Sequence, residues 1–556
     1  MAGVSYSDKQ DEYEELPSDK PAYILAVDVG TTSMRSYIYD REAHIVGQYF
    51  KKVHLNYPQP GHVEMDPKVL WKDFCELMKG AIRDAGISSS QVTCMGLTSQ
   101  RNTFICWDRE TGKPFHNLIT WQDLRASEYV QSWNNSITLK GFHGGSKFLH
   151  FFTRQRRFFS ASILKFTIQQ VTMRLLWMLD HDINLRRRSA EGQVMFGTMD
   201  TWLLWKMTGG EIHVTDASFA SGTGMFDPFI MDWSSILCNL VGIPMSILPP
   251  VKDTSGFFCN IAPEILGASI PITAVVGDQQ AAMFGQCCFE VGDVKCTMGS
   301  GTFLDLNTGD KPHTSIAGLY PLVGWKIGPE VVYLAEGSAN DTATVIDWAK
   351  KMGLYEDVKE TSDIAESVED SGGVYFVAAF DGLQAPINDE TACTSIFGIN
   401  PKTRKPHILR AILESVAFRF KLLYEAALME TNLKLSYIRA DGGVCNNDFI
   451  LQLIADLISQ PVDRPQNVDM SSLGAAFLAG LATKVWKNKE ELKRVRKTGT
   501  CFEPRENWDK YRPTIQQWER AIKRSMHWYK FADPIEKENR MKRPLETMNT
   551  MTGFGD

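Results

Sequence analysis

The same hairpin pattern occurs twice in this chain of 556 residues, with the two copies about half the chain apart. Each copy consists of a β-rich run, a tight turn of glycine and small hydroxyl residues, and a second β-rich run. The first turn covers residues 30–33 (Gly-Thr-Thr-Ser) and the second turn covers residues 299–302 (Gly-Ser-Gly-Thr). Glycine lets the backbone approach a bound group closely, and consecutive turn amides form a concavity that binds anions. Two such turns indicate two lobes that hold a polyphosphate between them.

A chain of this length is too long for one hydrophobic core, so two large domains are expected. Strand-like and helix-like segments alternate throughout, which favours an α/β architecture. We expect a disordered lead at 1–21, a first domain at 22–290, a second domain at 291–530 and a mobile tail at 531–556.

Charge and cysteine content narrow the class of protein. The formal net charge of −7 argues against a general nucleic-acid-binding protein. The eleven cysteines are scattered and include no CxxC pair, so neither a disulfide framework nor a zinc site is indicated, and a reduced cytoplasmic compartment fits best. No signal peptide and no run of eighteen apolar residues is present, so a membrane span is not expected. The sequence leaves the oligomeric state open.

Hydrophobic patterns and turn residues predict the main secondary-structure elements. Strands are expected at 45–54, 92–98, 104–108, 271–277, 374–380 and 436–440. Helices are expected at 66–85, at 197–206, after 120–123 with Arg125 inside the helix, and at 334–352, 407–430, 446–459 and 472–482.

Residues 146–166 form a stretch in which basic side chains are interleaved with phenylalanine and leucine. Such a stretch can lie on an anionic membrane or on a protein partner. It can also be a surface loop and helix whose aromatic side chains pack inward, and this second interpretation is favoured. The basic residues are Lys147, Arg154, Arg156, Arg157 and Lys165.

Asp278 follows the buried strand predicted at 271–277 and opens a helix in the block Gly277-Asp-Gln-Gln280. Ligands of α/β proteins bind at the carboxyl ends of strands. A carboxylate at this place can accept a proton from a substrate hydroxyl while that oxygen attacks phosphorus. A lone aspartate here is more often a helix cap, so this residue alone does not decide the function.

The chain has no GxxxxGK[ST] motif and is therefore not a P-loop enzyme. A metal ion would have to be held by carboxylates near the phosphates, as Mg²⁺ prefers. Asp28, just before the first turn, and Asp278 are the candidate ligands.

Two further groups of residues have a possible binding role. Asp441-Gly442-Gly443, with Asn447, offers a flat patch without side chains that suits a purine, although a simple strand–helix turn has the same sequence. A guanidinium and an indole, from Arg101 and Trp121, could line a small polyol pocket. Taken singly, such residues are more often a surface ion pair and a core aromatic.

These blocks together resemble the FGGY carbohydrate kinases, of the actin-like (ribonuclease H-like) ATPase superfamily. The similarity spans about residues 22–530, and within the family the chain is most similar to the glycerol kinases, in a divergent animal branch of them. The resemblance implies two actin-like domains with a cleft between them, ATP and Mg²⁺ as cofactors, and a small polyol as substrate. The matching blocks are 28–33, 57–64, 100–101, 121–125, 196–203, 277–280, 382–386, 410–415 and 441–443.

Carried over position by position, the resemblance implies roles for individual residues, and two lobes that close over the substrates to exclude water. The β- and γ-phosphates would be held by Thr31, Thr32 and Ser33, with Arg35 nearby, and by Gly299, Ser300 and Gly301. The nucleotide side would include Ala343, Asp347, Gly443 and Asn447. The polyol site would be lined by Arg101, Asn102, Trp121, Gln169, Gln279 and the base Asp278.

Several positions depart from the family pattern, and these bear on the substrate more than on the fold. Asn102 replaces a glutamate that accepts hydrogen bonds from the polyol, and losing a charged acceptor costs about 1.5–3 kcal/mol. Gln169 stands at the place of a family tyrosine. On the nucleotide side, Ala343 and Asp347 replace a glycine and a glutamine.

Three functions follow from the sequence. The first is an ATP-dependent kinase for a small polyol, glycerol by family default, with Asp278 as base. The second, suggested by Asn102 and Gln169, is a kinase for another sugar or polyol. The third is a nucleotide-binding regulator or scaffold with weak catalysis, suggested by Ala343, Asp347 and the stretch 146–166. Intact Asp278 and the two turns count against the third.

Overall fold

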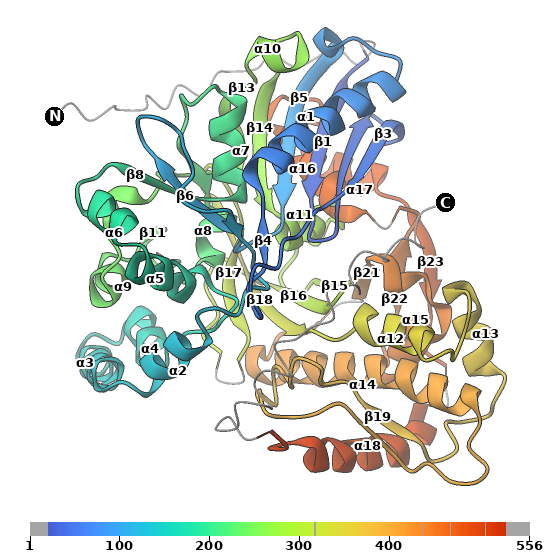
Figure 1. Ribbon diagram of the computed structural model, residues 1–556. Helices are drawn as coiled ribbons and strands as arrows, with labels where there is room; N and C mark the ends of the chain where they lie inside the picture. Colours follow the sequence, from blue (N-terminus) through green and yellow to red (C-terminus); the bar gives the residue numbers. More distant parts are fainter. Residues whose placement is uncertain (1–20, 316–317, 436–437, 468, 506–507, 530–556) are drawn as a thin grey trace.

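The computed structural model describes residues 21–529 except 316–317, 436–437, 468 and 506–507 (Figure 1). The predicted lead, up to residue 20, and the predicted tail from 531 lie outside the described residues. Within the described part, two large mixed sheets, each with its own helices, form two domains that meet in the middle of the molecule. The α/β architecture with two domains is confirmed.

The first domain is built on a six-stranded sheet with the order β13-β14-β5-β1-β2-β3. Strands β1, β2 and β3 form an antiparallel meander, and the β1–β2 hairpin carries the first turn. Strands β5 and β14 run parallel to β1, so the carboxyl ends of all three lie at one edge of the sheet. Asp28, Arg101 and Asp278 come together at this edge because each lies at or just beyond the end of one of these strands. The strands are β1 (Tyr23–Val29), β2 (Ser33–Tyr39), β3 (Ile45–Lys52), β5 (Val92–Ser99), β13 (Ser255–Asn260) and β14 (Pro271–Gly277).

The second domain repeats this plan in a seven-stranded sheet with the order β17-β18-β16-β15-β21-β22-β23. The antiparallel hairpin β15–β16 carries the second turn, and β21 and β22 run parallel to β15. The two hairpins therefore hold equivalent places in the two sheets. The strands are β15 (Val294–Met298), β16 (Thr302–Gly309), β17 (Tyr320–Ile327), β18 (Glu330–Ala339), β21 (Ile438–Asp441), β22 (Val462–Pro465) and β23 (Thr498–Phe502).

The remaining strands are short and form smaller sheets around the first domain and one hairpin in the second. They are β4 (Glu64–Met65), β6 (Phe104–Asp108), β7 (Leu118–Ile119), β8 (Val194–Thr198), β9 (Thr215–Asp216), β10 (Phe226–Asp227), β11 (Asp232–Trp233), β12 (Val251–Lys252), β19 (Tyr375–Val377) and β20 (Ser395–Phe397).

Helices cover the faces of both sheets and fill the space between them (Figure 1). Those up to the domain junction are α1 (Pro67–Asp84), α2 (Ser127–Asn135), α3 (Ile137–Thr153), α4 (Arg156–Ser162), α5 (Val171–His181), α6 (Ile183–Ala190), α7 (Met199–Met207), α8 (Ala217–Gly222), α9 (Ser235–Val241), α10 (Pro263–Leu266) and α11 (Asp278–Gly285). Those after it are α12 (Ala343–Lys351), α13 (Thr361–Glu366), α14 (Lys405–Thr431), α15 (Asp448–Ile458), α16 (Met470–Ala482), α17 (Lys489–Val495) and α18 (Arg512–Ser525).

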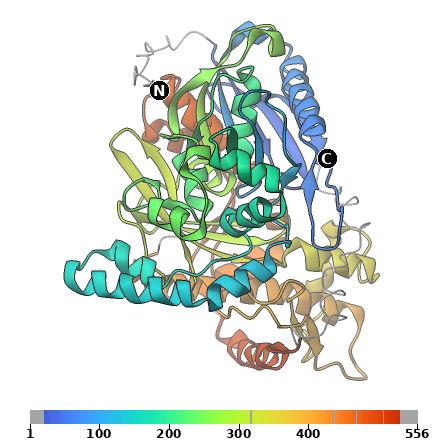
Figure 2. The same cartoon turned by 60° about the vertical axis from the view of Figure 1, so that its left-hand side comes forward.

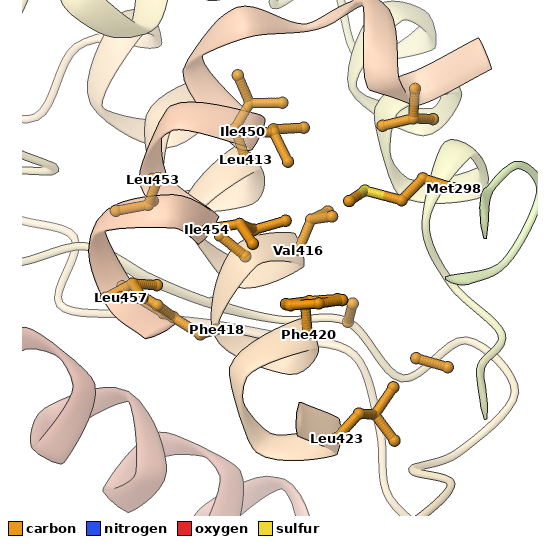
Figure 3. Close-up of a cluster of buried hydrophobic side chains, with 14 of the residues drawn as sticks. Met298, Leu413, Val416, Phe418, Phe420, Leu423, Ile450, Leu453, Ile454 and Leu457 are labelled. Carbon is orange, nitrogen blue, oxygen red and sulfur yellow. The ribbon is translucent and has the colours of Figure 1, made fainter. Parts of the chain in front are cut away.

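Local sequence explains how individual helices begin and what they bury. In α1, the Asp66 side chain accepts hydrogen bonds from the first-turn amides, Pro67 occupies the first helical position, and one apolar face is buried. In the second domain, α14 and α15 pack side by side and bury leucine, isoleucine and phenylalanine side chains between them (Figure 3). This packing forms the core against which β15 and its turn rest.

The two domains meet where α11 packs against α16 (Figure 1). Glycines allow the backbones of the two helices to touch, since a Cβ atom on Gly474 would lie 1.8 Å from the Ala281 carbonyl oxygen. A Cβ atom on Gly285 would lie 2.3 Å from the Met470 carbonyl oxygen. Helix α11 begins at Asp278, so this contact fixes the position of the candidate base relative to the second domain.

The helix predicted at 334–352 is wrong in its first half. Residues 334–339 belong to β18, which pairs with β16 on one side and β17 on the other, so the sheet satisfies the backbone polar groups on both sides. The helix, α12, begins only at Ala343. A buried apolar run does not by itself distinguish a central strand from a helix.

Arg125 lies before α2, so the prediction that it lies inside this helix is wrong. Its guanidinium pairs with Asp123 at 2.8 Å and with Glu64 at 2.7 Å, so the residue joins the loop to β4.

The stretch 146–166 is mostly helical and lies in α3 and α4, which project from one side of the first domain (Figures 1 and 2). The predicted inward packing of its aromatic side chains is wrong for Phe148, Phe151 and Phe152, which are exposed. It holds for Phe166, which is buried. No helix among the described residues is long and apolar enough to cross a membrane.

Candidate active site

A cavity of about 2950 Å³ lies between the two domains and is lined by residues of both. Nearly all the residues that the sequence predicted for a site line this cavity, from both turns to the polyol-site candidates. Asn447 is the exception among them. The cavity is several times larger than a typical pocket for one small molecule, so it has room for two ligands side by side.

The first turn is narrow because the Gly30 amide donates a hydrogen bond to the Ser33 carbonyl at 3.0 Å. A Cβ atom on Gly30 would lie 2.9 Å from that carbonyl, so a glycine is required there. The Trp121 indole N–H donates to the Thr31 hydroxyl at 3.0 Å. This bond joins a residue predicted to bind polyol to a residue predicted to bind phosphate.

The second turn is joined by its backbone to the start of α12. The Gly299 carbonyl accepts a hydrogen bond from the Ala343 amide, and the Ser300 carbonyl accepts one from the Thr342 amide, both at 3.1 Å. Asp347, one turn further along α12, also lines the cavity, and burial raises the pKa of its carboxyl group. Two of the nucleotide-side positions predicted from the sequence, Ala343 and Asp347, therefore lie on the helix that follows the second turn.

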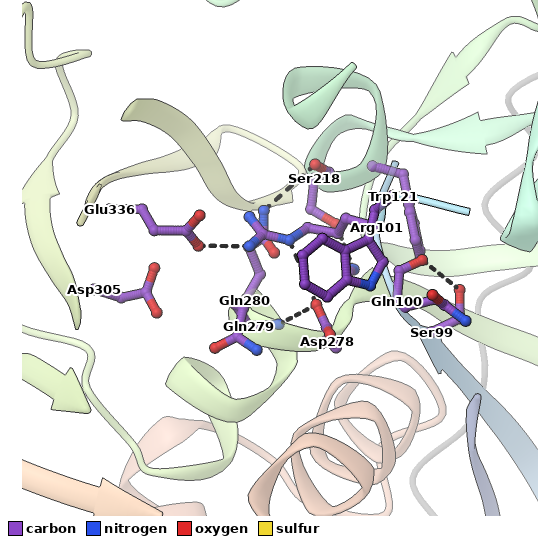
Figure 4. A network of polar contacts seen from close by, with 12 residues as sticks. Ser99, Gln100, Arg101, Trp121, Ser218, Asp278, Gln279, Gln280, Asp305 and Glu336 are labelled. Atoms are coloured by element: carbon purple, nitrogen blue, oxygen red, sulfur yellow. Dashed lines mark hydrogen bonds and ion pairs between the residues drawn. The ribbon is translucent and has the colours of Figure 1, made fainter. Parts of the chain in front are cut away.

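Asp278 stands at the first position of α11, and its carboxylate faces the guanidinium of Arg101 (Figure 4). The Arg101 Nε atom lies 3.4 Å from the nearer Asp278 oxygen, and the Gln279 amide donates to the same carboxylate at 2.8 Å. Burial raises the pKa of Asp278, and Arg101 partly offsets this effect. The carboxylate is thus a stronger base than an exposed one while it still has a positive partner.

Arg101 also reaches across the cavity to Glu336 on β18, with 2.6 Å between the guanidinium and the carboxylate (Figure 4). Burial raises the pKa of Glu336 to about 8, although Arg101 opposes the shift. The sequence analysis did not identify Glu336 as a site residue. Its carboxylate nevertheless provides a direct ion pair between the two domains.

Lys295 is a second site residue that the sequence analysis missed. It is fully buried on β15, where its ammonium group lies 2.8 Å from Asp305 and donates to the Gln279 side-chain oxygen at 2.7 Å. Gln279 is therefore held toward the second domain. No local sequence signal marks Lys295, because both of its partners are defined only by the fold.

Asn102 occupies the left-handed region of backbone space, with φ at 62°, which asparagine adopts more readily than most residues. Its Oδ1 atom is buried and has no hydrogen-bond partner among the described residues. The buried guanidinium of Arg174 donates to the carbonyl oxygens of Asn102 at 2.8 Å and Gln169 at 2.7 Å. Arg174 thereby holds together two of the positions that depart from the family pattern, both on the polyol side.

Asp28 is buried beside the first turn, and one of its oxygens accepts a hydrogen bond from Ser471 at 2.6 Å. Its other oxygen is buried without a hydrogen-bond partner in the described structure. Burial raises the pKa of Asp28 to about 7, and the nearby Asp278 adds to the shift. Arg35, predicted to lie near the phosphates, lines the cavity and forms an ion pair with Asp469.

Gly442 and Gly443 line the cavity at the end of β21, as predicted for a flat patch. A Cβ atom on Gly442 would lie 2.6 Å from the Met298 carbonyl oxygen, so the glycine is needed there. Asn447 has a different place. Its side chain caps α15 through the Ile450 amide and donates to the Thr361 hydroxyl, both at 2.9 Å. Its neighbour Asn446 lines the cavity instead.

Both domains of the chain are similar to domains of a known protein family. Residues 23–285 match the N-terminal domain of the FGGY family of carbohydrate kinases, and residues 294–483 match its C-terminal domain. The chain is 55% identical to Glycerol kinase 5 of Danio rerio over 518 residues, which cover 92% of this chain and 98% of that protein. It is 51% identical to Glycerol kinase 5 of Homo sapiens, over 92% of this chain and 96% of that protein.

A solved structure with a similar fold is that of Plasmodium falciparum glycerol kinase with ADP. It has 30% sequence identity and a TM-score of 0.81, and the alignment covers 91% of this chain and 98% of that one.

Proposed function

The chain belongs to the FGGY family of carbohydrate kinases, and on that premise we propose that it transfers the γ-phosphoryl group of ATP to glycerol. The product would be glycerol 3-phosphate. Relatives at 50–55% identity that carry the name glycerol kinase support the choice of substrate. The observation that carries the proposal is the position of Asp278, which faces Arg101 in the cavity between the two glycine turns.

Asp278 is the general base in this proposal. Its carboxylate accepts the proton of the attacking hydroxyl while that oxygen forms a bond to the γ-phosphorus and the bond to the β-phosphate oxygen breaks. The raised pKa of Asp278 brings its base strength closer to the working pH. Arg101 orients the carboxylate, and Trp121, Asn102 and Gln169 surround the polyol.

The two turns and the start of α12 hold the nucleotide. The Gly30 and Gly299 amides donate within their own turns, so the other backbone amides of the first turn (30–33) and the second turn (299–302) face the phosphates. The hydroxyls of Thr31, Thr32, Ser33 and Ser300 add further donors. The adenosine lies against Gly443 and α12, where Ala343 and Asp347 line the cavity. ADP in the glycerol kinase structure from Plasmodium falciparum supports a nucleotide in this cavity.

The carboxylates near the proposed phosphate positions are of the kind that binds Mg²⁺. Asp278 lies close enough to Asp28 for its charge to raise the pKa of Asp28, and one Asp28 oxygen is buried without a partner among the described residues. Mg²⁺ is usually held by one or two carboxylates together with phosphate oxygens. Bound here, the ion would neutralise phosphate charge, while Asp28 orients it from the end of β1.

The test is an assay of phosphoryl transfer from ATP to glycerol with the variant Asp278→Asn. Turnover is expected to fall by about 10²–10⁴-fold while nucleotide binding is kept, because the two turns and α12, which hold the nucleotide, are unchanged. Asp66→Asn is the matched control, since Asp66 caps α1 outside the cavity and asparagine caps equally well. Unchanged turnover in Asp278→Asn would contradict the assignment of the base.

A second candidate function is phosphorylation of a different polyol. The unpartnered Asn102 oxygen favours it, because an amide at this position can satisfy a different arrangement of hydroxyl groups. A panel of small polyols separates the two candidates by kcat/KM. Nucleotide binding without turnover on any polyol would contradict both and favour a nucleotide-binding regulator.

A further inference from the structure

Helix α3 presents an apolar face to solvent. We define the aromatic patch as Phe148, Phe151 and Phe152. These residues are 63%, 64% and 66% exposed, respectively. Residues spaced by three and four share one face of a helix, so the three rings lie together, and neighbouring ring centroids are 4.8 and 5.2 Å apart. Buried Leu139 and Ser146 lie on the opposite face, toward the protein. This is the reverse of the pattern expected of a surface helix.

The sequence on either side of the aromatic patch carries charge of one sign. No aspartate or glutamate occurs from residue 129 to residue 179, although the chain as a whole carries a formal charge of −7. Lys147, Arg154 and Arg156 are exposed near the patch, and the Arg154 guanidinium lies 5.5 Å from the centre of the Phe151 ring. The patch is therefore apolar at its centre and basic at its edge.

The body of the protein holds this helix pair in a defined orientation. The Arg157 guanidinium lies 2.6 Å from Asp227, and the Ser160 hydroxyl lies 2.6 Å from the Thr314 hydroxyl in the second domain. Figure 2 shows α3 and α4 as a pair that projects from the rest of the chain. The aromatic patch consequently lies on a projecting helix pair that is anchored to both domains.

We propose that the aromatic patch binds the surface of a membrane that contains anionic lipids. Phenylalanine side chains on one face of a helix enter the boundary between head groups and acyl chains, and adjacent lysine and arginine side chains are attracted to acidic head groups. A projecting patch with a basic edge, in a stretch without aspartate or glutamate from residue 129 to residue 179, fits a flat negative surface. It does not fit a second copy of this chain, whose equivalent patch would have the same charge.

The experiment is flotation of the full chain with phosphatidylcholine vesicles that do or do not contain phosphatidylserine. The wild-type chain is expected to bind the vesicles with phosphatidylserine and to lose binding at high salt. Replacing all three phenylalanines by serine should weaken this binding about tenfold or more, because the apolar contribution is removed. Charge reversal by Lys147→Glu, Arg154→Glu and Arg156→Glu should weaken it to a similar extent.

Ile183→Ser with Met429→Ser is the matched control, because these apolar residues are 80% and 77% exposed and lie on α6 and α14. Its binding should equal that of the wild type, and the circular dichroism of all variants should match it. The proposal is overturned if the wild type does not float, or if the serine variant floats equally well. It is also overturned if the serine variant changes only the sedimentation of the chain, which would make a second copy the occupant.

Discussion

The Arg101 guanidinium lies 2.6 Å from Glu336 and 3.4 Å from Asp278, so one cation joins the opposite domain to the candidate base. Arg101 follows the end of β5 in the first domain, and Glu336 lies on β18 in the second. Opening of the cavity would separate Glu336 from Arg101 and change the charge near Asp278. The relative position of the domains and the strength of the base are therefore coupled.

Replacing Arg101 with alanine tests this coupling. The variant leaves the buried Glu336 carboxylate and the half-buried Asp278 carboxylate without Arg101, and loss of one member of a buried pair costs about 3–5 kcal/mol. We expect the thermal unfolding midpoint to fall and turnover on the polyol to fall by about 100-fold. Thermal unfolding and the phosphoryl-transfer assay measure the two effects on the same sample.

The double variant Arg101→Ala with Glu336→Gln separates the structural effect from the catalytic one. Glutamine removes the carboxyl group that has lost its partner, so the unfolding midpoint should recover while turnover stays low. Recovery of turnover along with stability would mean that Arg101 acts only as a structural partner of Glu336.

Asp28 should make stability depend on pH. Burial raises the pKa of Asp28 from 3.8, its value in the unfolded chain, to about 7 in the folded chain. The contribution of the protonated Asp28 to stability is therefore fully present below pH 3.8 and is lost as the pH rises to about 7. The slope from one such group is at most about 1.4 kcal/mol per pH unit. In the wild type the unfolding midpoint should fall as the pH rises from 3.8 to about 7, and in Asp28→Asn this fall should be smaller.

Mg²⁺ provides the complementary measurement on Asp28. With ADP present, Mg²⁺ should raise the unfolding midpoint of the wild type near neutral pH and should raise that of Asp28→Asn much less. Equal effects of Mg²⁺ on the two proteins would show that Asp28 does not contribute to holding the ion.

Gly474 should tolerate no side chain. A Cβ atom there would lie 1.8 Å from the Ala281 carbonyl oxygen, which belongs to the backbone of α11 and cannot rotate away. Gly474→Ala must push α16 from α11, and we expect a loss of about 1–3 kcal/mol in the free energy of unfolding. Turnover should fall too, because α11 carries Asp278. Denaturant unfolding and the kinase assay check both expectations.

Gly141→Ala is the control for this substitution. Gly141 lies in α3, and a Cβ atom there would meet nothing within 4 Å. Alanine is the better helix former by about 0.5–1 kcal/mol, so this variant should be slightly more stable than the wild type. If the two variants lost stability equally, the contact between α11 and α16 would not be the cause.

The parts of the site that the sequence could predict are those with a local signal. The glycine turns, the strand before Asp278 and the cap of α1 all depend on residues a few positions apart. Glu336 had no such signal, because its partner Arg101 is 235 positions away and only the fold brings them together. Asn447 did carry a local signal, that of a helix cap, and the structure gives it that place.

The aromatic stretch 146–166 shows a different limit of sequence analysis. The spacing of Phe148, Phe151 and Phe152 predicts that they share a helix face, but periodicity alone does not say whether that face is turned toward the protein or toward solvent. The direction depends on what α3 packs against, and Leu139 and Ser146 occupy that side.

The substrate preference should respond to residue 102. Asn102→Glu restores a charged acceptor, worth about 1.5–3 kcal/mol, but glutamate in the left-handed backbone conformation found there costs about 1–2 kcal/mol. The expected net gain of about 1 kcal/mol corresponds to a rise of roughly fivefold in kcat/KM for glycerol. Asn102→Gln meets a similar backbone cost without adding a charge, so it should fall below the wild type. If both variants gained equally, side-chain length and not charge would determine the preference, and the buried Asn102 oxygen would have no part in choosing the polyol.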